Sequence, residues 1–357
     1  MAPATRRSRL TRVAVVVATA MLAAACGGAP EHVAGTAARS APPARPAVSS
    51  PTSPSRTASA APVRAAAVGT AGTYRVGERR MTFSEPAHAG VTGQHLGERS
   101  VLTLIRYPVT RSGSWPSGGP FPLLMFAPGF RQCSDTYEHL LQSWASAGYV
   151  VAVVDFPRTD CLVGAAAYEP DLVNQPGDVS YVLSRLLALN AQPGGFLSGR
   201  LNPREVAATG QSDGGDTVAA LAANPCCQDH RLKAVAVLSG AEWPPMPGTY
   251  FAGQAPPPML FVQGSADTIN PPWTSVQLYR ADRASPRYYL DLYGADHMVP
   301  YTGDNPVERF VARVTLAFFG RYVLGRAGAV ATMRRDASGS GGIAALGSGG
   351  RLPPGTG

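Results

Sequence analysis

Residues 206–223 constrain the fold of this chain more than any other stretch. A short apolar run leads into the motif Gly-Gln-Ser-Asp-Gly at 210–214, and a run rich in Ala and Leu follows directly. This order is typical of a strand, a sharp turn and a helix, with Ser212 at the apex of the turn. The turn needs glycine at positions 210 and 214, because a side chain there would collide with the neighbouring backbone. The hydroxyl of Ser212 is then held clear of the sheet, which makes it a candidate nucleophile.

Strand and helix patterns alternate on both sides of this turn, which favours a nucleophile over a plain glycine-rich turn. Two extended runs come first, and strand and helix then follow one another. This order predicts an α/β fold with a mostly parallel, eight-stranded sheet and helices on both faces. Reactive groups of such sheets gather at the carboxyl ends of the strands. The predicted strands cover residues 79–83, 100–107, 121–127, 149–154, 206–209, 232–239, 258–262 and 287–292, and the predicted helices cover 137–147, 177–190, 213–223, 273–282 and 305–324.

A serine hydroxyl needs an imidazole that accepts its proton. His297 follows the last predicted strand at its carboxyl end, so we expect it to be the general base. The alternative is an ordinary histidine in a surface loop. The other histidines lie near the N-terminus, between the first two strands, inside a helix or ahead of a strand: His32, His88, His95, His139 and His230.

The base in turn needs a carboxylate that fixes its tautomer and stabilises the imidazolium. Asp267 lies in the turn after the preceding strand, and we expect it to have this role; the same position also suits the N-cap of the next helix. Asp291 would lie within a strand, and Asp296 is too close to His297 along the chain. The order Ser212, Asp267, His297 is the one expected for this sheet topology.

An acyl-transfer site also needs hydrogen-bond donors for the developing oxyanion. We expect one donor to be the backbone N–H of Asp213, the residue after the serine. The other is expected in the loop after the third strand, where Gly129 permits a close approach and the N–H of Phe130 is best placed. The carboxylate of Asp213 would repel an oxyanion, so we expect it to point elsewhere.

The first 26 residues combine four arginines, a short apolar run and Cys26. The run is too short to span a bilayer and predicts an export signal. The sequence Leu-Ala-Ala-Ala-Cys at 22–26 resembles the lipobox of bacterial lipoproteins, in which the cysteine is acylated. The chain is therefore expected to be exported and anchored to the cell membrane through Cys26. Cleavage after Ala25 without acylation, which gives a secreted protein, is the alternative.

The rest of the chain divides into three parts by composition. Residues 27–72 are rich in Ala, Pro, Ser and Thr, and we expect a disordered tether there. Residues 325–357 are rich in Gly, Ser and Ala, which predicts a disordered tail. The part between them, 73–324, is long enough for one catalytic domain. The formal net charge of +8 comes mostly from arginine, but no basic cluster is interleaved with aromatic residues, so nucleic acid is not an expected partner.

The assembled motifs resemble those of the α/β-hydrolase superfamily over about residues 76–324. The segments at 125–130, 263–267 and 289–297 are similar to those of cutinase-like polyester hydrolases of actinobacteria, and to the platelet-activating-factor acetylhydrolase and chlorophyllase-like group. The resemblance implies a Ser-His-Asp esterase without metal or organic cofactor. Those polyester hydrolases usually have His before the serine and Met after it, where this chain has Gln211 and Asp213.

The resemblance also implies substrate-binding residues. Phe130 and Trp243 would flank the acyl or aromatic part of an ester; for Trp243, a loop anchor packed on prolines is the alternative. The loop 240–257 is too short for a large cap domain. An open cleft of this kind suits lipidic, aromatic or polymeric esters.

Four cysteines remain if Cys26 is acylated. In this fold Cys133 and Cys161 follow neighbouring strands, and we expect a disulfide between them. Cys226 and Cys227 are adjacent and are candidates for a vicinal disulfide. No second Cys/His pair has the spacing of a zinc site, so no metal is expected.

These observations together predict an extracytoplasmic serine ester hydrolase that works through an acyl-enzyme. Two other functions remain open. One is an acyltransferase or perhydrolase that uses the same three residues. The other is a lipid-anchored binding protein that retains the fold without turnover.

Overall fold

The computed structural model describes residues 68–283 and 286–356, all of which belong to one compact unit. The predicted export signal, Cys26 and the tether up to residue 67 lie outside the described residues. Within the described ranges, no helix is both long and apolar enough to cross a bilayer.

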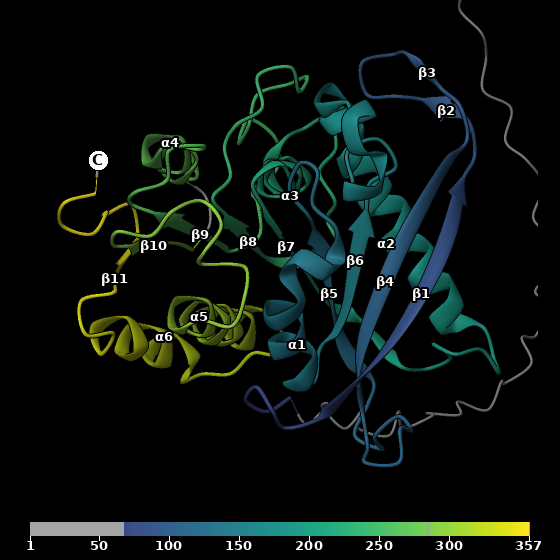
Figure 1. The fold of residues 1–357 in the computed structure, drawn as a ribbon, viewed down its shortest axis with the longest axis horizontal. Helices are drawn as coiled ribbons and strands as arrows, with labels where there is room; N and C mark the ends of the chain where they lie inside the picture. The colour runs from purple at the N-terminus through teal and green to yellow at the C-terminus, as the bar shows by residue number, and fades with distance from the viewer. Residues whose placement is uncertain (1–67, 284–285, 357) are drawn as a thin grey trace, which may run out of the picture. The chain divides into compact units, whose positions relative to one another are not determined.

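A mixed sheet of nine strands runs through the unit (Figure 1). The order across the sheet is β1 (Arg75–Glu85), β4 (Arg99–Val109), β6 (Val150–Asp155), β5 (Phe121–Ala127), β7 (Leu201–Gln211), β8 (Leu232–Leu238), β9 (Met259–Gly264), β10 (Arg287–Leu292) and β11 (Ala344–Ser348). The six strands from β6 to β10 in this order are parallel, whereas β4 is antiparallel to both of its neighbours and β11 is antiparallel to β10. A separate two-stranded sheet pairs β2 (His88–Ala89) with β3 (His95–Leu96). The prediction of an α/β fold with a mostly parallel sheet is confirmed.

Helices cover both faces of the large sheet. One core contains side chains of α2 (Gln175–Ala191), α3 (Asp213–Ala223) and α4 (Pro272–Ala281). The other contains side chains of α1 (Glu138–Ser146), α5 (Pro306–Tyr322) and α6 (Ala329–Ser338), and Figure 1 shows these three helices together on one side. Three short 3-10 helices, η1 (Ser134–Tyr137), η2 (Cys161–Ala166) and η3 (Glu169–Asn174), lie in the loops after β5 and β6.

The central strands read as nearly continuous apolar runs because both of their faces are buried. Every residue of β5 is buried, and its side chains alternate between the two cores. Leu123 and Met125 belong to the core under α2 and α3, whereas Leu124 and Phe126 belong to the core under α1 and α5. This packing on two sides holds the carboxyl ends of the strands in place.

The prediction of a disordered tail is wrong for most of residues 325–357. α6 packs on the sheet through Met333, which is fully buried, and β11 pairs with β10, with Leu346 opposite Leu290. An edge strand gains its hydrogen bonds from backbone groups, so a segment of Ala and Gly with few large apolar residues can still form one. The same strand corrects the predicted count of eight strands to nine.

The amino-terminal boundary is also earlier than predicted. Val68 is buried in the core, and the N–H of Gly69 donates to the carbonyl of Ala147 at 2.8 Å. The last residues of the expected tether therefore belong to the folded unit, because Val68 packs into the core and backbone N–H groups of Gly69 and Gly72 donate to the end of α1. Residues 239–258, all of which the structure describes, contain no helix or strand, as expected for a connection without a cap domain.

Candidate active site

The turn at Ser212 has the predicted strand, turn and helix geometry. Ser212 joins β7 to α3 and has φ 56° and ψ −126°, a conformation that non-glycine residues rarely adopt. A Cβ at Gly214 would overlap the carbonyl of Ala127, and one at Gly210 would overlap the backbone of Gly214. Both glycines are required by close backbone contacts, as predicted.

The structure brings Ser212, His297 and Asp267 together in one hydrogen-bonded series. His297 Nε2 is 2.8 Å from Ser212 Oγ, and His297 Nδ1 is 2.7 Å from Asp267 Oδ2. Asp267 follows β9 and His297 follows β10, so both side chains reach the serine from the carboxyl ends of parallel strands. Among the described histidines, only His297 forms a hydrogen bond with this serine.

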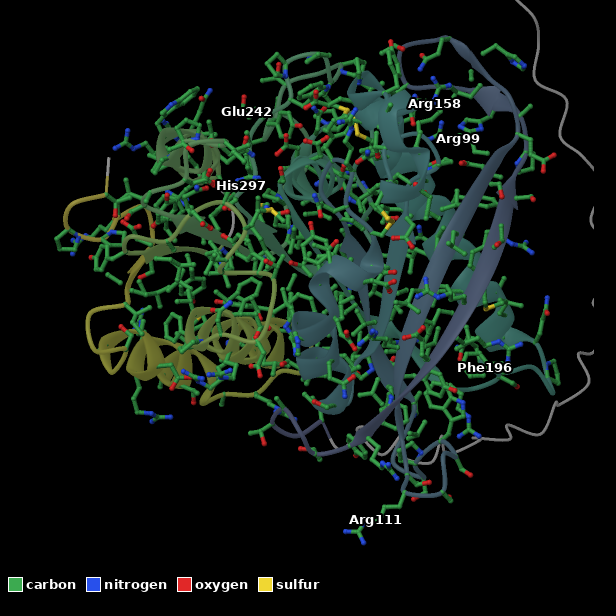
Figure 2. All side chains as sticks on the ribbon, viewed as in Figure 1. Arg99, Arg111, Arg158, Phe196, Glu242 and His297 are labelled. Atoms are coloured by element: carbon green, nitrogen blue, oxygen red, sulfur yellow. A yellow bond between two sulfur atoms is a disulfide. The ribbon has the colours of Figure 1, made fainter. Side chains whose placement is uncertain are left out.

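Figure 2 labels His297 and residues of several other loops at the two ends of the sheet. Arg158, Glu242 and His297 each follow a parallel strand and lie at one end of the sheet, whereas Arg111 and Phe196 lie at the other. His297 therefore lies at the end of the sheet where the parallel strands end, as predicted.

Asp267 is held by more than the imidazole. Its Oδ1 accepts hydrogen bonds from the backbone N–H groups of Ile269 and Asn270, each at 2.9 Å, and its Oδ2 accepts one from Gln263 Nε2 at 2.9 Å. Burial raises the pKa of this carboxyl, but the hydrogen bond and charge of His297 and the two backbone donors outweigh burial, so its pKa lies below the ordinary value. The N-cap of α4 is Pro271, so Asp267 does not have the alternative role of a helix cap.

The two other carboxylates considered from the sequence lie nearby but have different partners. Asp291 Oδ2 accepts a hydrogen bond from Thr356 Oγ1 at 2.5 Å. Asp296 Oδ1 accepts from the N–H groups of Met298 and Val299 at 2.9 and 2.8 Å. Asp296 therefore shapes the loop that carries His297.

The backbone amide of Phe130 stands out among its neighbours. The N–H of Gly129 donates to Tyr137 Oη at 3.1 Å, that of Arg131 to the carbonyl of Thr159 at 2.7 Å, and that of Gln132 to the carbonyl of Gly129 at 3.0 Å. The N–H of Phe130 has no acceptor within the described part of the chain. The N–H of Asp213 donates to no other described residue. Asp213 begins α3, so its N–H also lies at the positive end of a helix dipole. Neither amide donates to another described residue, and the Asp213 N–H interacts with its own carboxyl.

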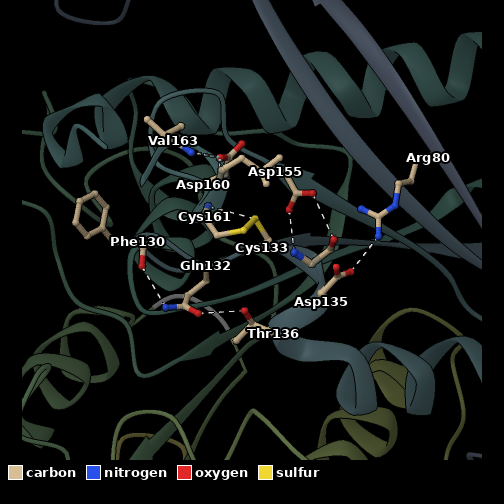
Figure 3. The surroundings of a disulfide bond; sticks show 12 residues. Arg80, Phe130, Gln132, Cys133, Asp135, Thr136, Asp155, Asp160, Cys161 and Val163 are labelled. Carbon is tan, nitrogen blue, oxygen red and sulfur yellow. Dashed lines mark hydrogen bonds and ion pairs between the residues drawn. A yellow bond between two sulfur atoms is a disulfide. The ribbon is translucent and has the colours of Figure 1, made fainter. Parts of the chain in front are cut away.

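The loop that carries Phe130 is attached to the next loop by a disulfide, as predicted (Figure 3). Cys133 and Cys161 are bonded, with their Cα atoms 5.3 Å apart. Between Phe130 and this bond, Arg131 has φ 57°, a strained value for a residue other than glycine. The disulfide and the hydrogen bond from Arg131 to Thr159 therefore hold a strained turn directly after the Phe130 amide.

Replacing both Cys133 and Cys161 by serine is expected to lower the free energy of unfolding by about 3.5 kcal/mol, because the bond joins residues 28 positions apart and restricts the unfolded chain. Urea unfolding measures the loss. The matched control replaces Cys226 and Cys227, which form a vicinal disulfide. That bond closes almost no loop, so the expected change is under about 1 kcal/mol. Equal losses in the two variants would contradict the prediction.

The Asp213 carboxyl is more deeply buried than its sequence neighbours indicate. The residue is 7 % exposed, and its Oδ2 has no hydrogen-bond partner among the described residues. Burial raises the pKa of Asp213 to about 7, the negative charge of Glu169 adds to the rise, and its own N–H offsets part of it. The carboxyl of Asp216 is also buried, accepts from the N–H of Ala241 at 2.5 Å, and has a raised pKa for the same main cause. Near neutral pH, much of Asp213 is therefore uncharged.

Stability is expected to depend on pH through Asp213. Its folded-state pKa of about 7 exceeds the ordinary value of 3.8, so the folded chain binds more protons between these limits. The free energy of unfolding then falls as the pH rises from about 4 to about 7. Asp213→Asn should equal the wild type near pH 4 and be more stable near pH 8, by up to about 4 kcal/mol.

Urea unfolding at the two pH values measures this difference. Asp135→Asn is the control, because the side chain of Asp135 is exposed. A difference between Asp213→Asn and the wild type that does not change with pH would contradict the assignment.

The two residues expected to flank the substrate differ in their surroundings. Phe130 is partly buried, and the guanidinium of Arg131 lies 5.3 Å from its ring centroid. Trp243 packs against the core under α3, and its backbone N–H lies 3.5 Å from Tyr250 Oη. Its indole Nε1 has no hydrogen-bond partner among the described residues. Both the substrate-contacting role and the anchoring role of Trp243 are compatible with this position.

No protein-family model matches this chain, and no curated protein is significantly similar to it. Across residues 68–283 and 286–356, no three His, Cys, Asp or Glu side chains are grouped closely enough to hold a metal ion. The activity is therefore inferred from the geometry of Ser212, His297 and Asp267.

Proposed function

We propose that this chain is a serine hydrolase of carboxylic esters with an α/β-hydrolase fold, and that it works through an acyl-enzyme. The observation that carries the proposal is the series from Ser212 Oγ through both nitrogens of His297 to Asp267, with distances of 2.8 and 2.7 Å. A nucleophile, a base and a group that orients the base are the three parts that acyl transfer by serine requires.

The reaction begins at the serine hydroxyl. Ser212 Oγ attacks the ester carbonyl carbon while His297 Nε2 accepts the hydroxyl proton. Asp267 holds the proton of Nδ1 and stabilises the imidazolium that forms. When the tetrahedral intermediate collapses, the imidazolium returns the proton to the leaving alcohol. Water then attacks the acyl-enzyme by the same route and releases the acid.

The backbone amides of Phe130 and Asp213 are the proposed donors to the oxyanion. Fixed N–H groups that point at the developing charge stabilise the transition state without reorganisation. The buried carboxyl of Asp213 would oppose this if it were charged. Because its pKa is about 7, roughly half of this carboxyl is neutral at pH 7 and most of it is neutral below pH 6, which reduces the repulsion.

The order of elements supports the proposed fold. The strand that ends at Ser212 lies inside the parallel part of the sheet, and Asp267 and His297 follow later strands in the order expected of an α/β-hydrolase. We further propose that the chain works outside the cytoplasm, attached to the membrane through Cys26. Its disulfides are compatible with an oxidising compartment. Esters with lipidic, aromatic or polymeric groups are the proposed substrates, flanked by Phe130 and Trp243.

The test uses the full chain, a fluorophosphonate probe and a series of p-nitrophenyl esters from C2 to C16. The expected result is covalent labelling of Ser212, together with ester turnover that the probe abolishes. A folded chain that neither labels nor turns over ester would favour the binding protein without activity. Product analysis with an added alcohol or peroxide separates hydrolysis from acyl transfer.

A further inference from the structure

The side chain directly before the nucleophile is fully buried and makes two hydrogen bonds. Gln211 Oε1 accepts from Tyr137 Oη at 2.8 Å, and Gln211 Nε2 donates to the backbone carbonyl of His297 at 3.0 Å. One amide therefore joins the end of β7 to the loop that carries the imidazole.

The hydrogen bonds continue to the loop of the proposed oxyanion donor. The N–H of Gly129 donates to Tyr137 Oη at 3.1 Å, and Gly129 directly precedes Phe130. A backbone N–H can only donate and a carbonyl can only accept, so the direction of every bond in the series is fixed. Burial raises the pKa of Tyr137, which keeps the hydroxyl protonated and able to donate to Gln211.

Packing at Gly129 shows how closely the two loops approach. A Cβ at this position would lie 2.9 Å from Gln211 Oε1 and 3.1 Å from Ser212 Cβ. Any larger residue would push the oxyanion loop away from the serine turn. The position of the Gln211 side chain therefore requires glycine at residue 129.

We propose that Gln211 and Tyr137 are positioning residues, which hold the loop of His297 and the amide of Phe130 at fixed distances from Ser212. This inference rests on the proposed function. The serine hydroxyl, the imidazole and the Phe130 amide must act together but come from three separate loops. The hydrogen-bonded series Gly129, Tyr137, Gln211 and His297 connects these loops directly. Buried polar groups that lose their partners rearrange or admit water, so removing one bond should displace both loops.

The test compares Tyr137→Phe, Gln211→Met and the double variant, each in the full chain. Phenylalanine keeps the ring without the hydroxyl, and methionine has about the shape of glutamine without its hydrogen bonds. Each single change is expected to lower kcat for p-nitrophenyl butyrate by about 10- to 100-fold, since small displacements of reacting groups have effects of this size. KM should change less than about threefold, because neither side chain is proposed to contact the substrate.

The double variant tests whether the two residues act as one unit. Because they belong to the same series, the double variant should lose no more than about the larger single loss. If the kcat loss of the double variant equals the product of the two single losses, the two residues act separately, and this result would overturn the proposal. If Gln211→Met does not fold, Gln211→Glu replaces it, since a carboxylate still accepts from Tyr137 but no longer donates to His297.

Thr315→Val is the matched control. Thr315 Oγ1 accepts a buried hydrogen bond from Trp144 Nε1 at 2.9 Å, between α5 and α1. This variant should lose stability but keep kcat. An equal kcat loss in Thr315→Val would show a general effect of destabilisation and would overturn the positioning role.

Labelling with the fluorophosphonate probe separates the two proposals. Wild-type protein that labels and turns over ester, beside folded variants with unchanged kcat, would overturn the positioning role alone. Wild-type protein that does neither would overturn the proposed function and this inference with it.

Discussion

Ser212→Ala is expected to lower kcat for p-nitrophenyl esters by about 10⁶-fold, the size of loss expected when the nucleophile of a serine hydrolase is removed. The substitution deletes the only atom proposed to bond to the acyl group. It also removes one hydrogen bond to His297 and leaves the glycines that shape the turn in place. The fold should therefore survive. Initial rates measured with active-site-titrated wild type and an equal concentration of the variant give the ratio.

The control for this variant is a measurement of its folding. Circular dichroism and urea unfolding should place Ser212→Ala within about 1 kcal/mol of the wild type, because the lost contact is small. Comparable turnover by the two proteins would show that another group carries out the reaction, and the proposed mechanism would then be wrong.

Asp267→Asn is expected to lower kcat by about 10³- to 10⁴-fold with little change in KM. An amide in place of the carboxylate can present a donor to His297 Nδ1, which then favours the tautomer with its proton on Nε2. That imidazole cannot accept the serine proton. The loss of a negative charge also removes support for the imidazolium. Steady-state kinetics above neutral pH measure the effect.

Asp291→Asn is the matched control for Asp267→Asn. Both carboxylates are buried, and they lie on or after neighbouring strands, but Asp291 bonds to Thr356 rather than to His297. Its replacement should leave kcat within about twofold of the wild type. A large loss at Asp291 together with a small loss at Asp267 would reverse the assignment of the acidic partner.

The parts of the site that could be predicted from the sequence depend on local rules. The turn at Ser212 is specified by two glycines within two positions of it, whose place in the backbone leaves no room for a Cβ. Asp267 and His297 are far from the serine along the chain. They could still be placed, because parallel strands bring their carboxyl ends to one edge of a sheet.

The parts that could not be predicted depend on packing between distant segments. Tyr137 and Gln211 are 74 positions apart, and their hydrogen bond requires the exact approach of two loops. The raised pKa of Asp213 likewise depends on its burial in the folded chain and on the charge of Glu169, which is distant in sequence. The composition of the tail is poor in apolar residues and therefore predicts disorder, whereas its strand is stabilised by the backbone of β10.

The C-terminal strand β11 also determines what truncation of this chain would do. Without residues 344–348, β10 would present unpaired backbone groups along its whole length, and exposed edges of this kind invite self-association between molecules. β10 leads directly into the loop of His297. The C-terminal strand thus covers the edge of the strand that leads to His297. Chains truncated after residue 324 should self-associate more readily and hold the imidazole less firmly.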